Sequence, residues 1–158
     1  MRVQSVEKAF RVLRAFDATR PTLSLTQLAV VANLDKSAAQ RFAHTLTELG
    51  YLRKDPATKR FELTVKTLDL GYRFVRTNAL VDRARPYLQH ISNTTEETVN
   101  LTVLDGAEVV FVSRMAGRHV INADIVIGAR TPAYCSAPGI AMLSRLDPDE
   151  AVRLLDLM

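Results

Sequence analysis

Apolar residues recur at steps of three and four along the first fifty residues, which is the spacing of helices that bury one face. The pattern predicts a first helix that begins at Ser5 and ends near Asp17. Its apolar face is expected to comprise Val6, Ala9, Phe10, Leu13 and Phe16. A proline within residues 20–22 then interrupts the pattern, so we expect a connection there.

A short second helix and a third helix are predicted on either side of a tight turn. Ser24 and Gln27 have the spacing of a capping box, which predicts that the second helix begins after Ser24. In the turn, Leu34 is expected to fill the corner between the helices, and Asp35 to cap the third helix, which Gly50 terminates. The buried stripe of the third helix is predicted to comprise Ala39, Phe42, Leu46 and Leu49.

A β-hairpin is predicted directly after the third helix. Residues 51–54 and 60–63 are typical of strands, and residues 55–59 are typical of the turn between them. Three helices followed by a hairpin are the order of a winged helix-turn-helix. We therefore assign this fold to residues 1–64, with the hairpin as the wing.

The rest of the chain predicts a linker helix and a second domain. Helical spacing indicates a linker helix over residues 65–79, then a helix in which Pro86 causes a kink or begins a fresh first turn. Apolar residues alternate from Thr98, as in strands, with a turn at Asp105–Gly106 and a third strand over residues 120–127. The fold class is therefore α+β, with the second domain over residues 80–158.

Charge is distributed unevenly between the two halves. Residues 1–75 contain thirteen Lys and Arg against seven Asp and Glu, whereas residues 76–158 contain eight against ten. A basic domain favours a polyanionic partner, because cations that neutralise phosphates release condensed counterions. Nucleic acid is the natural candidate.

Composition argues against several other classes of protein. The chain is 47% hydrophobic and 24% charged, as in globular proteins, and no apolar run approaches the roughly 18 residues of a membrane span. The single cysteine and three scattered histidines, His44, His90 and His119, give no metal motif. No catalytic constellation or phosphate-cradling loop is present, so we expect that the protein is no enzyme and carries no cofactor. Because no membrane span is predicted, we expect a cytoplasmic protein.

The third helix carries groups that could contact DNA on the face opposite its predicted stripe. A charged helix face alone is usually a solvated surface, but here it coincides with a short second helix, a tight turn and a basic hairpin. That combination favours DNA binding. The predicted DNA contacts are Thr26, Lys36, Ser37, Ala38, Gln40, Arg41, His44, Thr45, Lys59 and Arg60.

The sequence resembles the IclR-type bacterial transcriptional regulators along essentially its whole length. The segments that carry the resemblance are residues 4–9, 23–29, 34–41, 45–51, 61–63, 68–71, 97–106 and 109–114. It implies that the second domain is a GAF-like effector-binding module, and that a homodimer or tetramer binds an operator in double-stranded DNA and responds to a small organic acid. Residues 16–17, 49–51 and 68–72 further resemble the branch that controls aromatic-acid catabolism through the β-ketoadipate pathway.

The chain departs from the pattern of that family in two ways. Ile140 stands where members usually have a lysine after the glycine of the pocket motif, so any anchoring by that lysine is absent. Members also normally continue beyond the position of Met158. We therefore expect that the carboxyl-terminal part is missing, that the effector domain is partial, and that its ligand response is impaired.

The predicted effector site is the loop that leads into a helix near Gly139. Its residues are Arg130, Cys135, Ser136, Ala137 and Gly139. A ligand carboxylate could dock on the helix N-terminus with help from Ser136 and Arg130. The alternative is that Ser136 only caps the helix and Arg130 is solvated. For Cys135, a small buried filler is the more usual role than a reactive thiol.

The sequence as a whole predicts a DNA-binding transcriptional regulator that controls a catabolic operon in response to an effector. The alternative is a small-molecule sensor or an enzyme of α+β fold whose basic N-terminal domain makes only protein contacts.

Overall fold

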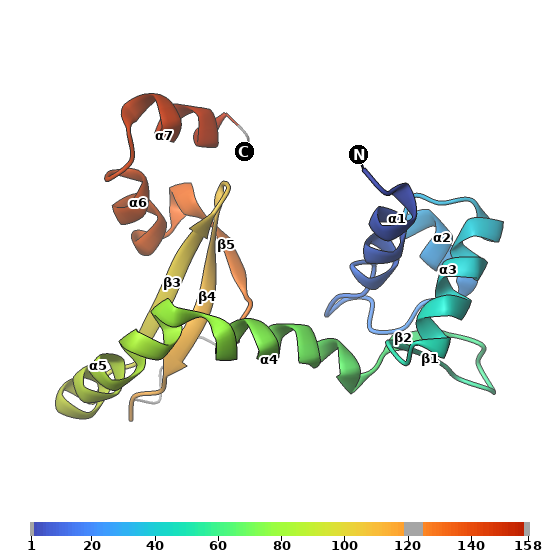
Figure 1. Cartoon of the computed structure of the whole chain (residues 1–158), viewed down its shortest axis with the longest axis horizontal. Coiled ribbons are helices and arrows are strands. Elements are labelled where there is room, and N and C mark those ends of the chain that lie inside the picture. The colour runs from blue at the N-terminus through green and yellow to red at the C-terminus, as the bar shows by residue number, and fades with distance from the viewer. Residues whose placement is uncertain (1, 119–124, 157–158) are drawn as a thin grey trace. The chain divides into compact units, whose positions relative to one another are not determined.

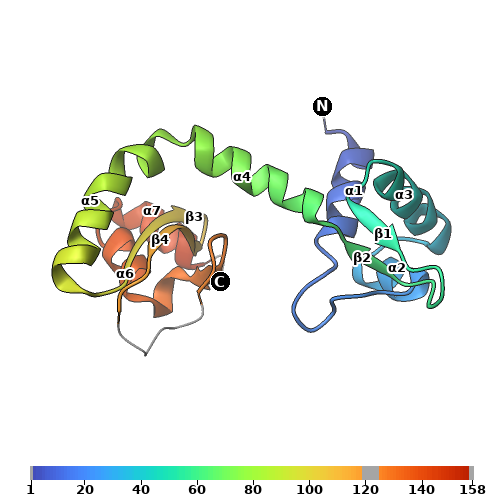
Figure 2. The ribbon, with the colours of Figure 1, turned by 90° about the horizontal axis from the view of Figure 1, so that it is seen from below.

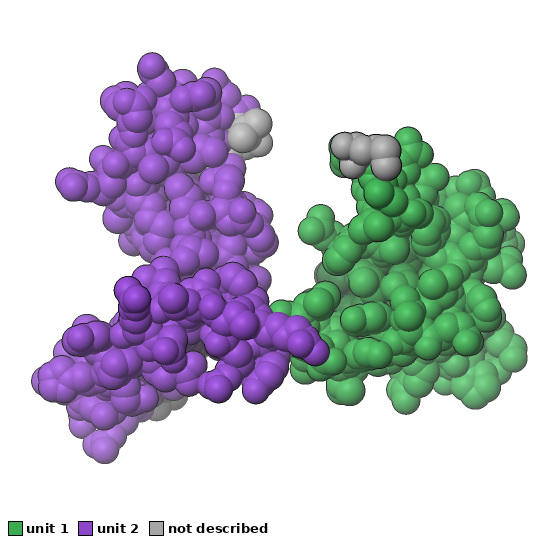
Figure 3. Space-filling view, in the orientation of Figure 1, with its two compact units in different colours: residues 1–70 green, residues 71–158 purple. Residues whose placement is uncertain are grey.

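The computed structural model describes residues 2–118 and 125–156. The chain divides into two compact units, Met1–Leu70 and Gly71–Met158, which are coloured separately in Figure 3. The described elements are helices and small antiparallel sheets, which confirms the α+β class.

Unit 1 contains three helices followed by a hairpin (Figure 1). Its elements are α1 (Gln4–Leu13), α2 (Leu25–Val31), α3 (Lys36–Glu48), β1 (Leu52–Lys54) and β2 (Phe61–Leu63). This order confirms the predicted winged helix-turn-helix.

Local capping sets the ends of α2 and α3 as predicted. The Ser24 hydroxyl accepts from the Gln27 backbone N–H, and the Gln27 side chain accepts from the Ser24 N–H, which completes the capping box. The Asp35 carboxylate accepts from the Ala38 N–H at 2.8 Å. After α3, Gly50 adopts φ +80°, a left-handed conformation that glycine adopts without steric cost.

A single apolar cluster holds unit 1 together. Its buried members are Val12, Ala15, Leu23, Leu28, Ala32, Ala43, Leu46, Leu52 and Phe61. Leu34 packs against this cluster, as predicted for the corner between the helices. Leu23 and Phe61 also exchange two backbone hydrogen bonds, of 2.9 and 2.8 Å, so the segment before α2 adds a bridge to the hairpin that the sequence did not reveal.

The first helix differs from its prediction at both ends. Val3 rather than Ser5 precedes it, without a side-chain cap, and it ends at Leu13 rather than near Asp17. Asp17 instead organises the following turn by accepting from the backbone N–H groups of Thr19 and Arg20. Hydrogen bonds from the Arg20 guanidinium and from Thr19 hold the pKa of Asp17 well below its usual range. The apolar residues in the sequence keep a helical spacing as far as Phe16, but this turn ends the helix at Leu13.

A set of helices and a three-stranded antiparallel sheet make up the described remainder of the chain. In order these are η1 (Val65–Thr67), α4 (Leu68–Thr77), α5 (Ala79–Thr95), β3 (Val99–Asp105), β4 (Glu108–Met115), β5 (Arg130–Pro132), η2 (Ala133–Cys135), α6 (Ala137–Leu143) and α7 (Pro148–Leu155). Within the described residues, no helix combines the length and apolar character needed to cross a bilayer.

The sheet of unit 2 has the order β3-β4-β5. β3 and β4 form the predicted hairpin around Gly106, and Val109 and Ala133 are buried in the small core beneath α6. The predicted third strand was wrong over residues 125–127, which are not in a strand; residues 120–124 lie outside the described residues. β5 takes that place because residues 130–132 pair with residues 108–110.

The helix break in the linker region lies at Asn78. The Asn78 side chain accepts from the backbone N–H groups of Leu80 and Val81 and so begins α5. α5 then continues through Pro86, so the expectation of a fresh first turn at Pro86 was wrong. Near the end of the chain, Asp147 caps α7 and Pro148 occupies its first turn.

Candidate nucleic-acid interface

One face of α3 is exposed and carries several polar and charged side chains without protein partners in the described residues. Lys36, Ser37, Gln40, Arg41 and His44 are exposed, and their side chains form no hydrogen bond or ion pair within the described residues. Cations and amides on one helix face can donate to phosphates and to the edges of bases in a major groove. α3 therefore presents free groups suited to duplex DNA, as the sequence predicted for these five residues.

Two further predicted contacts on α3 behave differently. Thr45 is exposed, and its hydroxyl donates to the Arg41 backbone carbonyl at 3.0 Å, so the oxygen can still accept. Ala38 is 2% exposed, so its predicted position on the outward face was wrong. Ala38 lies one turn before Phe42, which packs on the core, and therefore faces inward. Leu49, predicted to be buried, is instead exposed at the helix end.

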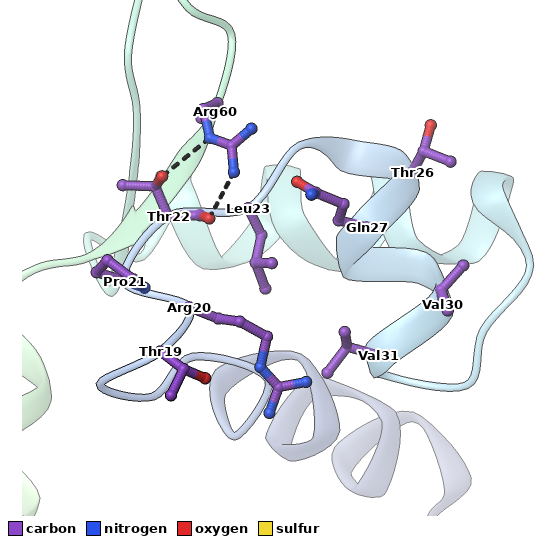
Figure 4. A pocket seen from close by; sticks show the side chains of 10 residues that line it. All are labelled: Thr19, Arg20, Pro21, Thr22, Leu23, Thr26, Gln27, Val30, Val31 and Arg60. Carbon is purple, nitrogen blue, oxygen red and sulfur yellow. Dashed lines mark hydrogen bonds between the residues drawn. The ribbon is translucent and has the colours of Figure 1, made fainter.

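Most cations of the hairpin are held by internal partners. Arg60 is half-buried, and its guanidinium donates to the Thr22 hydroxyl at 2.9 Å and to the Thr22 carbonyl at 2.8 Å (Figure 4). Arg53 pairs with Glu62 across the hairpin, and the Lys54 ammonium lies 5.3 Å from the centre of the Phe61 ring. These cations stabilise the hairpin, a role that the sequence did not reveal.

Lys59 is the hairpin cation that stays available. It is exposed and adopts φ +59°, and its side chain forms no hydrogen bond or ion pair within the described part of the chain. Asp55 fixes the turn by accepting from the Ala57 and Thr58 N–H groups. The Thr58 hydrogen bonds lower the pKa of Asp55 below its ordinary value. Lys59 is thus presented to solvent by an ordered turn.

Thr26 lies on the exposed side of α2, next to a shallow hollow of about 430 Å³ (Figure 4). The hollow is bordered by residues 19–23, by α2 and by Arg60. Of its cations, Arg20 pairs with Asp17 and Arg60 is held by Thr22, so neither guanidinium is free of partners. Thr26 itself has no side-chain partner among the described residues and stays a predicted DNA contact.

A second hollow adjoins the exposed face of α3, and sequence reasoning missed it. Its volume is about 460 Å³, and we call it the α1–α3 hollow. It is lined by Gln4, Ser5, Lys8, Arg41, Phe42 and Thr45. The signal that could have revealed it is the polar spacing of residues 4, 5 and 8, which share one face of α1.

In unit 2, Arg130 makes its hydrogen bonds to two carboxylates and to none of the other predicted effector residues. Its guanidinium donates to Asp105 at 2.5 Å and to Glu108 at 2.9 Å. Hydrogen bonds to Asp105 and then to Glu108 raise the pKa of Arg130 above its usual value. Arg130 is therefore neither merely solvated nor an unpaired cation that awaits a carboxylate.

The remaining predicted effector residues lie together at the start of α6. Ser136 occupies the N-cap position of α6, but its hydroxyl is buried without a hydrogen-bond partner in the described structure and so forms no side-chain cap. Gly139 is buried, and an added Cβ would lie 2.2 Å from the Ala133 carbonyl oxygen, so close packing requires glycine. Ala137 is exposed. Cys135 is also exposed, which contradicts its expected role as a buried filler.

Arg130 instead borders a more apolar hollow of about 560 Å³. Its other lining residues come from α4, Asn78 and the strands β3 and β4, among them Phe74, Val103 and Val110. This hollow includes none of residues 135–139. Of the two histidines outside unit 1, His90 is exposed and His119 lies outside the described residues.

Two family models match the chain. The IclR helix-turn-helix domain matches residues 5–56, and the C-terminal domain of the bacterial transcriptional regulator IclR matches residues 73–157. The first match lies within unit 1 of the fold, and the second lies within unit 2.

Named relatives and solved structures agree with these matches. The chain is 31% identical over 144 residues to the Pca regulon regulatory protein of Pseudomonas putida, which covers 90% of this chain and 49% of that relative. The chain thus spans about half the length of this relative. An IclR family transcriptional regulator from Brucella abortus superposes with a TM-score of 0.83 at 28% identity, over 99% of this chain and 59% of that one.

A third solved structure shows the same fold. It is an IclR homolog from Microbacterium hydrocarbonoxydans, crystallised with 4-hydroxybenzoate. The TM-score is 0.74 at 20% identity, and the match covers 96% of this chain and 63% of that one.

Proposed function

The chain belongs to the IclR family of bacterial transcriptional regulators, and from this premise we propose that it binds an operator in double-stranded DNA and regulates transcription. The observation that carries the proposal is the exposed face of α3, whose cations and polar side chains have no partners in the described structure. The family is one of regulators rather than enzymes.

In this proposal α3 enters a major groove. Arg41 and Gln40 lie on its exposed face and have the chemistry to read guanine and adenine edges, respectively. Lys36, Ser37, His44 and Thr45 flank them as further contacts to bases or phosphates. Lys59 and Arg60 of the hairpin, and Thr26 of α2, are proposed contacts to the backbone, with Arg60 able to offer only the donors that Thr22 leaves free.

A mobility-shift titration with the DNA upstream of the chain's own gene tests this proposal. We expect a discrete complex that competitor DNA of unrelated sequence displaces poorly, and an Arg41→Ala variant that loses this preference. Binding that unrelated DNA competes away equally well would contradict sequence-specific regulation. Absence of any complex at low ionic strength would contradict DNA binding altogether.

We further propose that the chain acts as a homodimer on a nearly two-fold symmetric operator, with half-sites about 34–36 Å apart, and that higher assembly proceeds from that dimer. Exposed apolar side chains support it, because Val65, Leu68 and Tyr72 recur at helical spacing along η1 and α4 and are at least 67% exposed. A DNA-binding regulator of a bacterium works in the cytoplasm, where we place this one.

Light scattering tests the proposed dimer by comparing the molar mass of the chain with that of a Leu68→Glu/Tyr72→Glu double variant. We expect the wild-type chain to have the mass of a dimer and the variant to have the mass of a monomer. An unchanged mass in the variant would contradict this dimer surface.

The proposed effector is a small organic acid, and the proposed site is the segment 135–139, to which Arg130 would contribute only by releasing Asp105 and Glu108. The unpartnered Ser136 hydroxyl supports it, since a ligand could supply the missing hydrogen bond. The names of two similar proteins, a Pca regulon regulator and a homolog crystallised with 4-hydroxybenzoate, favour an aromatic acid and control of aromatic-acid catabolism.

Calorimetric titration with 4-hydroxybenzoate tests this site. We expect saturable binding that Ser136→Ala weakens and Ser144→Ala, a substitution of an exposed serine after α6, does not. Binding that is indifferent to Ser136 would contradict the proposed site.

A further inference from the structure

The α1–α3 hollow brings two cations together without a counter-ion. Lys8 of α1 and Arg41 of α3 both line it, beside the hydroxyls of Ser5 and Thr45 and the amide of Gln4. No carboxylate is among its lining residues. Neither Lys8 nor Arg41 has a side-chain hydrogen bond or ion pair anywhere in residues 2–118 or 125–156. The hollow is therefore electropositive and rich in donors.

Three other cations of unit 1 are neutralised by neighbouring carboxylates. Arg2 pairs with Glu7, Arg20 with Asp17, and Arg53 with Glu62. Two unpaired cations that share one hollow repel one another, which costs the free protein stability unless a polyanion relieves the repulsion. This pair of cations lies directly beside the exposed face of α3, and that position indicates which polyanion would relieve the repulsion.

The hollow also has the right place in the unit. Figures 1 and 2 both place the start of α1 and the tip of the β1–β2 hairpin on opposite sides of unit 1. A helix in a major groove about 12 Å wide has a phosphate backbone on each of its flanks. The hairpin can reach one of these backbones through Lys59, which leaves α1 beside the other.

We propose that Lys8, with Ser5 and Gln4, binds a phosphate of the DNA backbone on the flank of the groove opposite the hairpin. The first turns of α1 then act as a second backbone clamp, and α3 is held in register from both sides. The clamp rests on the proposed function, since it needs a duplex against α3. It adds a binding role for α1, whose other face packs on the core through Val12.

The test measures how binding depends on salt. The probes are the upstream duplex that the wild-type chain protects and a duplex of equal length and arbitrary sequence. For Lys8→Gln, we expect the slope of log K against log salt to fall by about 0.9 for each bound subunit, on both probes. The preference for one probe over the other should stay unchanged, because a phosphate carries no sequence information.

Matched variants distinguish a phosphate contact by Lys8 from a general effect of net charge and from a loss of folding. Lys8→Arg keeps a cation and should keep the slope. Arg14→Gln removes an exposed cation directly after the same helix, outside the hollow, and should also leave the slope unchanged. The melting temperature of Lys8→Gln should equal or exceed that of the wild type, since the substitution removes the repulsion with Arg41.

Each other outcome is decisive. If the wild-type chain binds and Lys8→Gln keeps its full salt slope, the clamp is wrong while the proposed function stands. A changed preference between the probes would make Lys8 a base contact and overturn the clamp. Equal loss of binding in Lys8→Arg and Lys8→Gln, with a lowered melting temperature, would make Lys8 a structural residue. Failure of the wild-type chain to bind either probe would instead overturn the proposed function.

Discussion

The third helix of unit 1 carries two Lys and Arg side chains and the hairpin carries four, and most of the hairpin cations are in the opposite state to those of the helix. Lys36 and Arg41 on α3 are exposed and have no partners in the described structure. On the hairpin, Arg53 pairs with Glu62 and Arg60 is held by Thr22. The same residue types therefore do different work: α3 offers its cations outward, whereas the hairpin uses most of its cations to hold itself together.

The comparison shows why basic composition alone does not locate a DNA contact. A guanidinium that already donates to a protein oxygen must give up that bond, or use its remaining donors, before it can bind a phosphate. Lys59, the available hairpin cation, is presented by a turn that Asp55 fixes. The following predictions test the contrast between the two elements.

The largest expected effect is on α3. Arg41→Ala should weaken binding to the protected operator by about 1–3 kcal/mol and affect binding to unrelated DNA far less, because a bidentate contact to a base is lost. Fluorescence anisotropy with both duplexes measures this difference. An unchanged footprint and affinity would remove Arg41 from the recognition surface.

The hairpin should respond in its stability instead. Arg60→Ala removes two hydrogen bonds from a half-buried guanidinium and should lower the free energy of unfolding by about 1–3 kcal/mol, as measured by urea denaturation. Lys59→Ala is the matched control, since it should leave stability unchanged and reduce the salt slope of DNA binding by about 0.9. If the two variants exchange these effects, the assignment of the hairpin cations is wrong.

The capping residue of α3 is expected to matter next. Asp35→Ala removes the acceptor for the Ala38 N–H and should lower the free energy of unfolding by about 1 kcal/mol. Asp35→Asn retains an acceptor oxygen and should recover most of that loss. Urea denaturation followed by circular dichroism compares the three proteins, and equal stability of Asp35→Ala and the wild type would show that the cap contributes nothing.

The smallest effect concerns acid and the hairpin turn. The pKa of Asp55 is lowered in the folded chain, so its contribution to stability is present above the ordinary carboxyl pKa and is lost as the pH falls through the lowered value. Melting temperatures between pH 2 and 7 should therefore fall more steeply at the acid end for the wild type than for Asp55→Asn. Parallel curves would show that this carboxylate does not couple the turn to pH.

Much of unit 1 could be predicted because its signals are local. The Ser24–Gln27 box, the Asp35 cap and the turn at Gly50 each depend on residues a few positions apart, and all three are in the structure. The end of α1 could not be predicted, since the apolar spacing runs on to Phe16 while the turn around Asp17 stops the helix.

Contacts between distant residues account for the remaining differences. Arg60 and Thr22 are 38 positions apart, so nothing local marks Arg60 as a structural residue. Ala38 is buried because it lies one turn before Phe42, on the face of α3 that packs on the core. In unit 2, Arg130 meets carboxylates 22 and 25 positions away, and only the pairing of β5 with β4 brings them within reach.

The exposed face of α3 can be tested without any substitution by labelling lysines with and without duplex DNA. Under conditions in which anisotropy shows a complex, reductive methylation read by mass spectrometry should report strong protection of Lys36. Lys66, whose ammonium donates to the Leu49 carbonyl at 2.8 Å, should react equally in both states. Lys36 that reacts equally with and without bound duplex would contradict the entry of α3 into the groove.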